Sequence, residues 1–398
     1  MSPGRKISVC FVAEHPSSGV IGGAEVAMAI LADQLVKEGV DVHYVSKEYF
    51  ETPARSIQLH RIAFMTRTVE SLVSHRRRYT RNRGEMDLVG QAHATVGENP
   101  MKGAADKLRL LVDRIYMQGY DSALSEADAD IYVQVCAGKP TGYVGSFCKK
   151  NGRPFVFRAT SLWDADLTFT WGWRSWRPRT KELYLQGIQQ ADIVAANSKH
   201  TAGAFTKHID KEKVRFLPDG FLIAPYPESP REDGYVLWVG RDKPYKRARL
   251  FADLARRLPA YQFVMVGDIR SIGDSPSNLR LLGPKKPSEL SEIYSDARLL
   301  VNTSEVEGFP NVLVEGAMHG VPYLGFLDPD DVVAEHSLGM QARDFSDMVR
   351  RVDMLMASED LRLKLGKNAR RFVEEHYDIR TVVKQWLNLL RELAITKT

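Results

Sequence analysis

Short apolar runs alternate with segments of helical period along the first half of the chain. Residues 7–13 and 40–45 are short, apolar and rich in valine, a pattern that favours buried strands. Between them, residues 23–38 predict an amphipathic helix. Its apolar side consists of Ala27, Ile30, Leu31 and Leu35. The strand pattern returns at residues 131–135, 154–157 and 193–197. This alternation of strands and helices predicts an α/β fold with a parallel, doubly wound sheet.

A second alternation of the same kind follows residues 223–234, which hold three prolines and several charges and are typical of a linker. Its predicted strands are residues 235–240, 262–267 and 299–301. From about residue 358 the pattern is strongly helical. Residues 66–107 are polar and irregular, and we expect them to be helical in part. The predicted units are a first domain over 1–222, a linker over 223–234, a second domain over 235–375 and a C-terminal helix over 376–398.

Composition agrees with a globular protein, because 44% of the residues are hydrophobic and 26% are charged. No apolar run approaches the 18 residues or so that suggest a membrane span. The first apolar run is short and is followed by Glu14 and His15, unlike a signal peptide. Cys10, Cys136 and Cys148 are widely spaced and form no metal-binding pattern. We therefore expect a cytoplasmic protein with reduced, structural thiols.

Positive charge is unevenly spread, although the net charge is only +5. Five arginines fall within eight residues that contain no acid: Arg76, Arg77, Arg78, Arg81 and Arg83. Such a basic cluster can bind nucleic acid, anionic lipid or a phosphorylated acceptor. No nucleic-acid-binding motif accompanies it, so nucleic acid is not an expected partner.

Four of the six tryptophans lie close together in the sequence, among basic residues: Trp163, Trp171, Trp173 and Trp176. Tryptophan beside arginine suits a membrane interface, but it also suits stacking on a sugar ring of an acceptor. A plain packed helix or loop is the third interpretation. Together with the arginine cluster at 76–83, these residues suggest peripheral contact with the inner face of an anionic membrane.

Two carboxylates, Glu307 and Glu315, flank a turn and the start of a helix. Upstream, residues 299–302 predict a buried strand, and Gly308 and Pro310 then favour a turn. A turn that opens a helix leaves free backbone N–H groups at a positive helix end, which suits a phosphate. The two glutamates can thus touch different parts of one ligand. Their spacing alone is common, and the residues between and after them carry the specificity.

The stretch Glu-Gly-Phe-Pro-Asn at 307–311, with Gly-Ala-Met-His-Gly-Val-Pro at 316–322, resembles the E-x7-E motif of retaining family-4 glycosyltransferases. These are GT-B enzymes that take a sugar from a nucleotide donor. The resemblance covers nearly the whole chain and is densest over 235–322. It implies two Rossmann-like domains facing a central cleft, with the C-terminal helix crossing back to the first domain.

The resemblance also implies roles for single residues. Glu315 would bind the ribose hydroxyls, and Glu307 would contact hydroxyls of the transferred sugar. The backbone at Gly308, Phe309 and Pro310 would shape the sugar pocket. Asn311, Val312 and Leu313 would offer N–H groups to phosphate, and Gly283 and Pro284 would lie beside the base.

Gly240-Arg241, followed by Lys246, looks like the basic element of the same family. A departing diphosphate carries negative charge, and fixed cations there act mainly in the transition state. Arg241 and Lys246 are therefore candidate catalytic residues. The alternative is that both are ordinary surface cations, since Lys243, Arg247 and Arg249 are close by.

A paired glycine, Gly22-Gly23, lies between the first strand and the first helix. It is not the dinucleotide motif G-x-G-x-x-G, so a nicotinamide cofactor is disfavoured. Relatives use a similar pair beside the donor phosphates, where glycine lets the backbone approach closely. A simple turn is the alternative.

Two departures from the family pattern stand out. Where many relatives carry a His-Asp-like element, this chain has residues 158–164, and Ser161 or Asp164 is the candidate for that place. Where relatives often show a Gly-Gly pair, residues 325–330 contain none. Residues 192–198 and 218–220 resemble family elements and are expected to be structural or hinge positions.

The sequence therefore predicts a retaining, metal-independent glycosyltransferase without a cofactor, which uses a UDP-linked donor in preference to a GDP-linked one. The acceptor would be a glycan or a lipid-linked glycan, as in polysaccharide biosynthesis. An epimerase or hydrolase of the same fold would turn over the donor without an acceptor. A non-catalytic sugar-binding scaffold is disfavoured, because Arg241, Lys246, Glu307 and Glu315 are all present.

Overall fold

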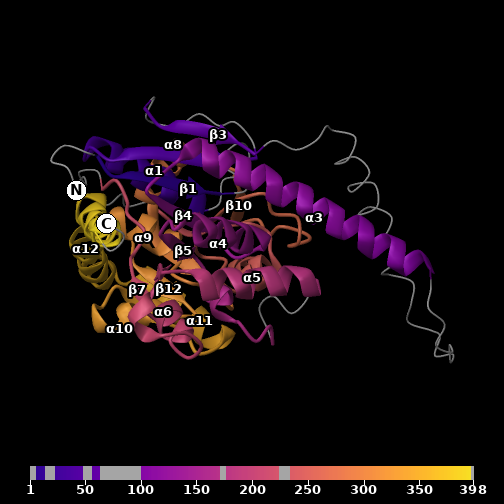
Figure 1. The fold of residues 1–398 in the computed structure, drawn as a ribbon. Coiled ribbons are helices and arrows are strands. Elements are labelled where there is room, and N and C mark those ends of the chain that lie inside the picture. Colours follow the sequence, from indigo (N-terminus) through magenta and orange to yellow (C-terminus); the bar gives the residue numbers. More distant parts are fainter. Residues whose placement is uncertain are drawn as a thin grey trace.

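The chain forms two parallel sheets flanked by helices, as seen in a computed structural model (Figure 1). The structure describes residues 6–13, 23–47, 56–62, 100–170, 176–223 and 234–395. Several positions singled out above lie outside these ranges: Gly22, the arginines of 76–83 including Arg76, Arg77 and Arg78, Trp171, Trp173 and most of the predicted linker.

The N-terminal domain is built on a seven-stranded sheet of order β3-β2-β1-β4-β5-β6-β7. Every pairing in it is parallel. The strands are β1 (Ser8–Val12), β2 (Asp41–Ser46), β3 (Gln58–Arg61), β4 (Ile131–Val135), β5 (Phe155–Ala159), β6 (Ile193–Ala196) and β7 (Val214–Phe216). The helices are α1 (Gly23–Lys37), α3 (Pro100–Ala127), α4 (Lys139–Asn151), α5 (Pro178–Gln190) and α6 (Lys199–Phe205), with short 3₁₀ turns η1 (Leu162–Ala165) and η2 (Lys211–Lys213).

The C-terminal domain has a six-stranded parallel sheet of order β10-β9-β8-β11-β12-β13. Its strands are β8 (Tyr235–Val239), β9 (Phe263–Val266), β10 (Leu279–Leu281), β11 (Ala297–Asn302), β12 (Tyr323–Gly325) and β13 (Gly339–Gln341). Its helices are α7 (Ala248–Arg257), α8 (Pro287–Ser295), α9 (Asn311–Met318), α10 (Val332–Glu335), α11 (Phe345–Ala357) and α12 (Glu359–His376), with 3₁₀ turns η3 (Pro244–Lys246) and η4 (Pro329–Asp331). The predicted α/β architecture of two doubly wound domains is confirmed.

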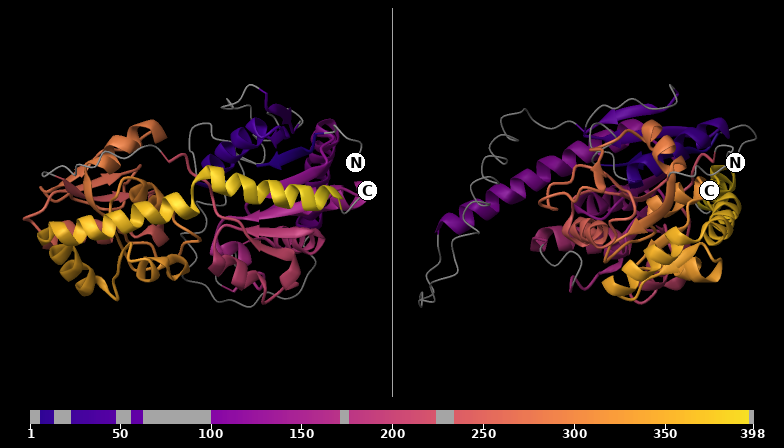
Figure 2. Two further views of the ribbon diagram at one scale, coloured as in Figure 1. Left: turned by 90° about the vertical axis from the view of Figure 1, so that its left-hand side faces the viewer. Right: turned by 180° about the vertical axis from the view of Figure 1, so that it is seen from behind.

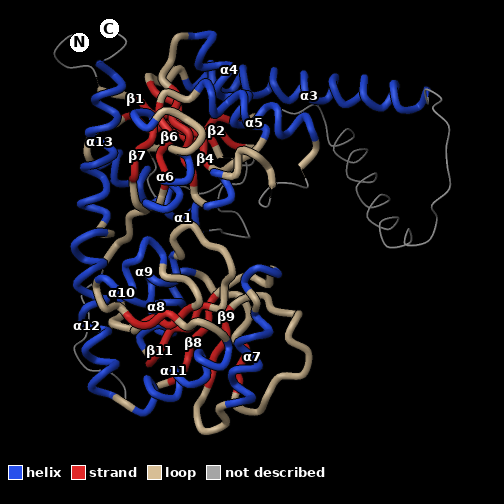
Figure 3. Tube along the Cα trace, turned by 90° about the horizontal axis from the view of Figure 1, so that it is seen from below, coloured by secondary structure: helices blue, strands red, loops and turns tan. Residues whose placement is uncertain are grey.

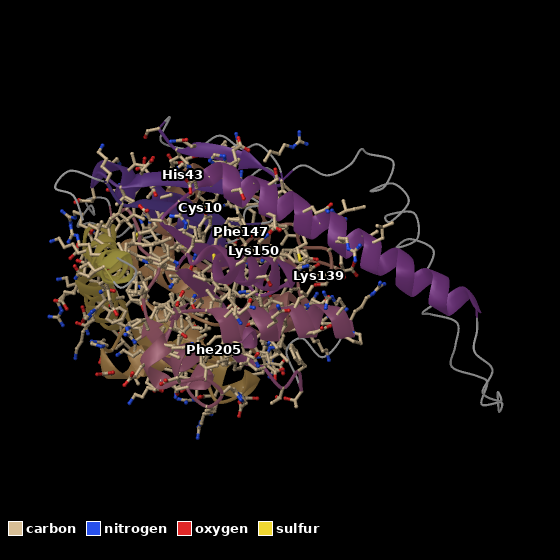
Figure 4. All side chains as sticks on the ribbon, in the orientation of Figure 1. Cys10, His43, Lys139, Phe147, Lys150 and Phe205 are labelled. Atoms are coloured by element: carbon tan, nitrogen blue, oxygen red, sulfur yellow. The ribbon has the colours of Figure 1, made fainter. Side chains whose placement is uncertain are left out.

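Each sheet is covered on both faces, as parallel sheets require. In the N-terminal domain, α1 and the last helix, α13 (Ile379–Ile395), pack on one face, and α3, α4 and α5 pack on the other. Figure 4 shows Cys10 and Phe147 among the side chains of this second face. In the C-terminal domain, α9 and α12 cover one face, and α7 and α11 cover the other.

The chain returns from the C-terminal domain to the N-terminal one through its last two helices. Figures 2 and 3 show α12 along the C-terminal domain and α13 along the N-terminal domain. Trp386 of α13 is fully buried against the N-terminal sheet, with its ring centroid 6.5 Å from that of Phe11. The predicted return of the C-terminal helix to the first domain is therefore confirmed.

Two chain crossings connect the domains and are hydrogen-bonded to each other. Phe221 N–H donates to Tyr377 O at 2.8 Å, and Ile379 N–H donates to Phe221 O at 2.9 Å. A Cβ at Gly220 would lie 3.2 Å from Ile379 Cα, so glycine permits this close crossing. The predicted hinge position at 218–220 thus lies at a paired crossing.

Helix α3 was not predicted at its full length. It runs over Pro100–Ala127 and extends well beyond the N-terminal domain (Figures 1 and 3). Its C-terminal half is anchored by Tyr120, Ala123 and Leu124, which are buried in the domain core. In the part of the chain that the structure describes, no helix combines the length and the apolarity needed to cross a membrane.

Candidate active site at the domain interface

Loops that follow the carboxyl ends of both sheets meet at the domain interface. Trp163, after β5, packs edge-on against Tyr245, after β8, with ring centroids 5.0 Å apart. A Cβ at Gly308, after β11, would lie 2.9 Å from Thr160 O and 3.2 Å from Ser161 Cα. Ligands of open α/β sheets bind at this end of the strands, so the interface is the place to look for a site.

Glu307 and Lys246 are paired at this interface. Lys246 Nζ lies 2.5 Å from Glu307 Oε1, and their side chains are only 21% and 12% exposed. The two residues are 61 positions apart and come from different loops. The structure therefore brings together two of the three predicted catalytic residues as a partly buried, charge-assisted hydrogen bond.

Arg241, the third of them, is exposed. The described residues give its side chain no hydrogen bond or ion pair in this structure. Arg241 was predicted to be catalytic, with Lys246, because Gly240-Arg241 and Lys246 resemble a family element. Its catalytic role stays a prediction.

The loop that presents Lys246 is held by residues that sequence reasoning did not single out. Arg247 adopts a left-handed conformation with φ of 51°, and its Nε donates to Thr303 O at 2.8 Å. The Thr303 hydroxyl donates to Lys246 O at 2.7 Å and accepts from Trp238 Nε1 at 3.0 Å. These bonds fasten the Lys246 loop to the end of β11. The sequence could have indicated Thr303, because a polar residue directly after an apolar strand lies at the end of the sheet where ligands bind.

Glu315 lies on α9 and is held by a tyrosine from α8. The hydroxyl of Tyr294 donates to Glu315 Oε2 at 2.6 Å, and Tyr294 itself is 1% exposed. Burial raises the pKa of Glu315, and the hydrogen bond from Tyr294 opposes this rise. No feature of the sequence pointed to Tyr294.

The first turn of α9 faces the first turn of α1 from the other domain. A Cβ at Gly23 would lie 2.5 Å from Asn311 Nδ2, so the Asn311 side chain packs directly over Gly23. Pro310 is the N-cap of α9, and Leu313 N–H already donates to Pro310 O at 2.9 Å. Among the described residues no acceptor is bonded to the N–H groups of Asn311 and Val312, so these two are the best placed for an anion, while that of Leu313 is engaged.

Phe309 and Gly308, which were predicted to shape the sugar pocket, are packed against other residues of the protein. The Phe309 ring is buried and stacks on Tyr377, with centroids 4.9 Å apart and planes at 24°. Phe309 thereby ties the turn before α9 to the chain crossing at 377. Gly308 is packed against the 160–161 loop, as described above, so its missing side chain allows the domains to meet.

Ser161 and Asp164 fix the loop after β5. Ser161 Oγ accepts from Trp163 N–H at 3.2 Å, and the carboxylate of Asp164 accepts from the N–H groups of Thr160 at 2.8 Å and Ser161 at 3.1 Å. Burial raises the pKa of Asp164 to about 6. The carboxylate of Asp164 is thus engaged by backbone groups that shape the loop.

Gly283 and Pro284 follow β10 at the same end of the C-terminal sheet. Gly283 has φ of 68°, and its carbonyl accepts from Gly267 N–H at 3.0 Å. A Cβ at Gly267 would overlap the carbonyl oxygen of Gly240, the residue before Arg241. The predicted base-binding residues and the start of the basic element therefore lie on neighbouring loops.

Of the tryptophan group, Trp163 and Trp176 are described. Trp163 contacts Tyr245 across the interface, as stated above. Trp176 packs against Tyr184 at 5.7 Å and 86°, which favours the plain packing interpretation for this residue. Among the described residues, no group of three or more His, Cys, Asp or Glu could hold a metal ion.

Comparison with known proteins finds similar sequences and similar folds. Residues 225–372 match the sequence model of the family "Glycosyl transferases group 1". An uncharacterized glycosyltransferase of Haemophilus influenzae is 23% identical in an alignment 179 residues long, which covers 40% of this chain and 49% of that protein. An N-acetyl-D-galactosaminyltransferase of Campylobacter jejuni is 23% identical over 177 residues, 41% and 49% of the two chains. The chain thus spans about half the length of these relatives.

Solved structures resemble nearly the whole chain. TarM superposes with a TM-score of 0.71 at 12% identity, over 98% of this chain and 100% of the other. Anabaena HepE in complex with UDP gives 0.64 at 14% identity, over 97% and 100%. WaaG, a glycosyltransferase involved in lipopolysaccharide biosynthesis, gives 0.64 at 14% identity, over 96% and 99%. The chain has the GT-B fold of these glycosyltransferases.

Proposed function

We propose that this chain transfers a sugar from a nucleotide-diphosphate donor to a glycan or lipid-linked glycan acceptor, with retention of configuration and without a metal. The observation that carries the proposal is the arrangement of three features around α9: the Lys246–Glu307 pair in the loops before it, its first turn facing Gly23, and the Glu315–Tyr294 pair one turn further along it. These groups match the diphosphate, the sugar and the ribose of such a donor.

The diphosphate would lie at the start of α9. The N–H groups of Asn311 and Val312 and the positive end of the helix favour negative charge there. Lys246 would leave Glu307 for the phosphate oxygens as the glycosidic bond breaks, because the negative charge on the leaving group then increases. Arg241, exposed at the neighbouring loop, is the candidate second cation.

The sugar and the ribose would each meet one glutamate. Once Lys246 turns to the phosphate, Glu307 Oε1 is free to accept a hydrogen bond from a hydroxyl of the transferred sugar. Glu315 would accept from the ribose diol. We do not assign the two glutamates to a glycosidase pair of acid and nucleophile. In the retaining reaction that we propose, the departing phosphate oxygen takes the proton of the attacking acceptor hydroxyl on the same face of the sugar.

Named complexes of similar folds support the choice of UDP. Anabaena HepE was solved with UDP, and a mutant of S. aureus TarM was solved with Fondaparinux, alpha-GlcNAc-glycerol and UDP. The Campylobacter jejuni relative is named for a PP-undecaprenol-linked sugar, which supports a lipid-linked acceptor. Membrane contact through Arg76, Trp171 and their neighbours stays a prediction.

Calorimetric titration with UDP, GDP, ADP and TDP, without metal, tests the proposal. We expect micromolar binding of UDP and weaker binding of the others, followed by sugar transfer from a UDP-sugar to an acceptor glycan. Turnover of the UDP-sugar without acceptor, to an epimer or to free sugar, would favour the epimerase or hydrolase. Binding of sugars without any turnover would favour the non-catalytic scaffold. Failure to bind any nucleotide would overturn the proposal.

A further inference from the structure

Tyr294 is placed to control the orientation of Glu315. Its hydroxyl donates to Glu315 Oε2 at 2.6 Å, across the contact between α8 and α9. Tyr294 is 1% exposed, so water cannot readily replace this hydrogen bond. A flexible glutamate side chain is therefore fixed by a buried donor from another helix.

The position of the Tyr294 hydroxyl is itself fixed by packing. The His319 ring stacks on the Tyr294 ring with centroids 5.9 Å apart and planes at 6°. His319 Nδ1 lies 3.1 Å from the Ser295 hydroxyl, which joins the histidine to the end of α8. The phenol therefore has little freedom to follow Glu315 if that carboxylate turns away.

Oε2 of Glu315 accepts from Tyr294, and among the described residues no donor is bonded to the other oxygen, Oε1. Each carboxylate oxygen accepts about two hydrogen bonds, so the bond from Tyr294 leaves acceptor capacity for a ligand. A carboxylate held in this way presents neighbouring acceptors in one orientation. Two adjacent hydroxyls of a ribose match this arrangement, whereas a single hydroxyl uses only part of it.

We propose that Tyr294 is a positioning residue for ribose recognition: by holding Glu315, it lets the protein distinguish a ribonucleotide from a 2′-deoxyribonucleotide. This inference rests on the proposed donor site. It assigns to the C-terminal domain a preference for UDP over 2′-deoxy-UDP that depends on a residue which never touches the nucleotide.

The test compares the affinities of UDP and 2′-deoxy-UDP, measured by calorimetry on the intact chain and on Tyr294→Phe. A hydrogen bond to a charged group corresponds to about a tenfold to hundredfold change in affinity. We expect the intact chain to prefer UDP by about that factor. Tyr294→Phe keeps the ring and its stacking, and should reduce the preference about tenfold, mainly by weakening UDP.

Tyr235→Phe is the matched control. Tyr235 lies in the same domain, is 9% exposed, and its hydroxyl donates to Ile293 O at 2.8 Å. Tyr235→Phe removes one phenol hydrogen bond to α8, the helix that carries Tyr294, and the preference for UDP over 2′-deoxy-UDP should persist. Glu315→Gln should lose the preference by itself, and adding Tyr294→Phe to it should change the preference no further.

The outcomes separate the inference from the proposed function. A folded Tyr294→Phe variant that keeps the full preference for UDP overturns the inference alone. Equal affinities of the intact chain for UDP and 2′-deoxy-UDP also overturn it, while nucleotide binding itself would still support a donor site. Absence of binding by either nucleotide overturns the proposed function and the inference together.

Discussion

At the scale of single residues, the Lys246–Glu307 pair makes the clearest prediction. Lys246→Ala should lower kcat about a hundredfold to a thousandfold, because a cation aimed at the leaving group acts mainly in the transition state. Lys243→Ala is the matched control, since Lys243 is an exposed lysine three positions away. Steady-state kinetics with a UDP-sugar measures both. Equal effects of the two substitutions would contradict the role of Lys246.

Asp164 predicts a pH dependence of stability. Burial raises the pKa of its carboxyl from 3.8 to about 6, so the folded state binds this proton more tightly than the unfolded state. The resulting stabilisation is full below 3.8 and is lost as pH rises through about 6. The loss amounts to up to about 3 kcal/mol.

Asp164→Asn removes this titration. The free energy of unfolding of the variant, relative to the unchanged chain, should therefore improve by up to about 3 kcal/mol between about pH 4 and pH 8. Urea denaturation at both pH values measures it. Asp210→Asn is the control, because Asp210 also caps a short helix but at an exposed site. A relative stability of Asp164→Asn that does not vary with pH would show that the carboxyl is not perturbed.

At the scale of elements, α4 and α5 depend on glycines for their close packing. A Cβ at Gly187 of α5 would overlap the carbonyl group of Thr141 on α4, and this backbone cannot easily move. Gly187→Ala should destabilise the chain by about 1–3 kcal/mol through overpacking. Gly203→Ala is the control, since nothing lies within 4 Å of its Cβ position and alanine favours the helix by up to about 1 kcal/mol. Urea denaturation of both variants checks the prediction; equal effects would contradict it.

The same scale shows what the sequence could predict. The strands at 7–13, 131–135 and 235–240 were identifiable because they are buried on both faces and therefore mostly apolar. Strand β3 (Gln58–Arg61) was not predicted, since this edge strand is only four residues long and has the sequence Gln-Leu-His-Arg, with one apolar residue. The full extent of helix α3 was not predicted, since a helix that extends beyond the core (Figure 1) need not carry the apolar period by which helices are recognised.

The backbone of the candidate site could be predicted from the sequence, but the residues that hold its side chains in place could not. Glu307, Gly308 and Pro310 could be found because a strand, a turn and a helix start follow one another directly. Tyr294 and Arg158 could not be found, because their hydrogen-bond partners lie far away in the sequence. Arg158 is fully buried and forms an ion pair with Asp219 at 2.6 Å, and the sequence around each of them gives no indication of this pair.

At the scale of the whole molecule, Asp330 joins the two domains. It is 6% exposed, and its carboxylate accepts from Lys199 N–H at 2.7 Å and His200 N–H at 2.8 Å, at the start of α6. Asp330 and Asp331 both have left-handed φ, 53° and 62°, conformations that favour glycine. The chain has aspartate at both of these positions, and through Asp330 it gains an interdomain cap of α6.

Replacement of Asp330 by glycine should therefore loosen the closed arrangement without straining the backbone. Two charged hydrogen bonds across the interface are lost, which shifts the balance between closed and open forms by about 3 kcal/mol. Small-angle X-ray scattering without ligand should show a larger radius of gyration for Asp330→Gly, and UDP should restore the compact form. Asp331→Gly should enlarge the radius of gyration less than Asp330→Gly does, because the Asp331 side chain is 79% exposed and contacts α6 through an ion pair with His200 at 3.3 Å. If Asp330→Gly stays compact without UDP, the contacts at Gly308, Trp163 and the paired crossings suffice to hold the domains together.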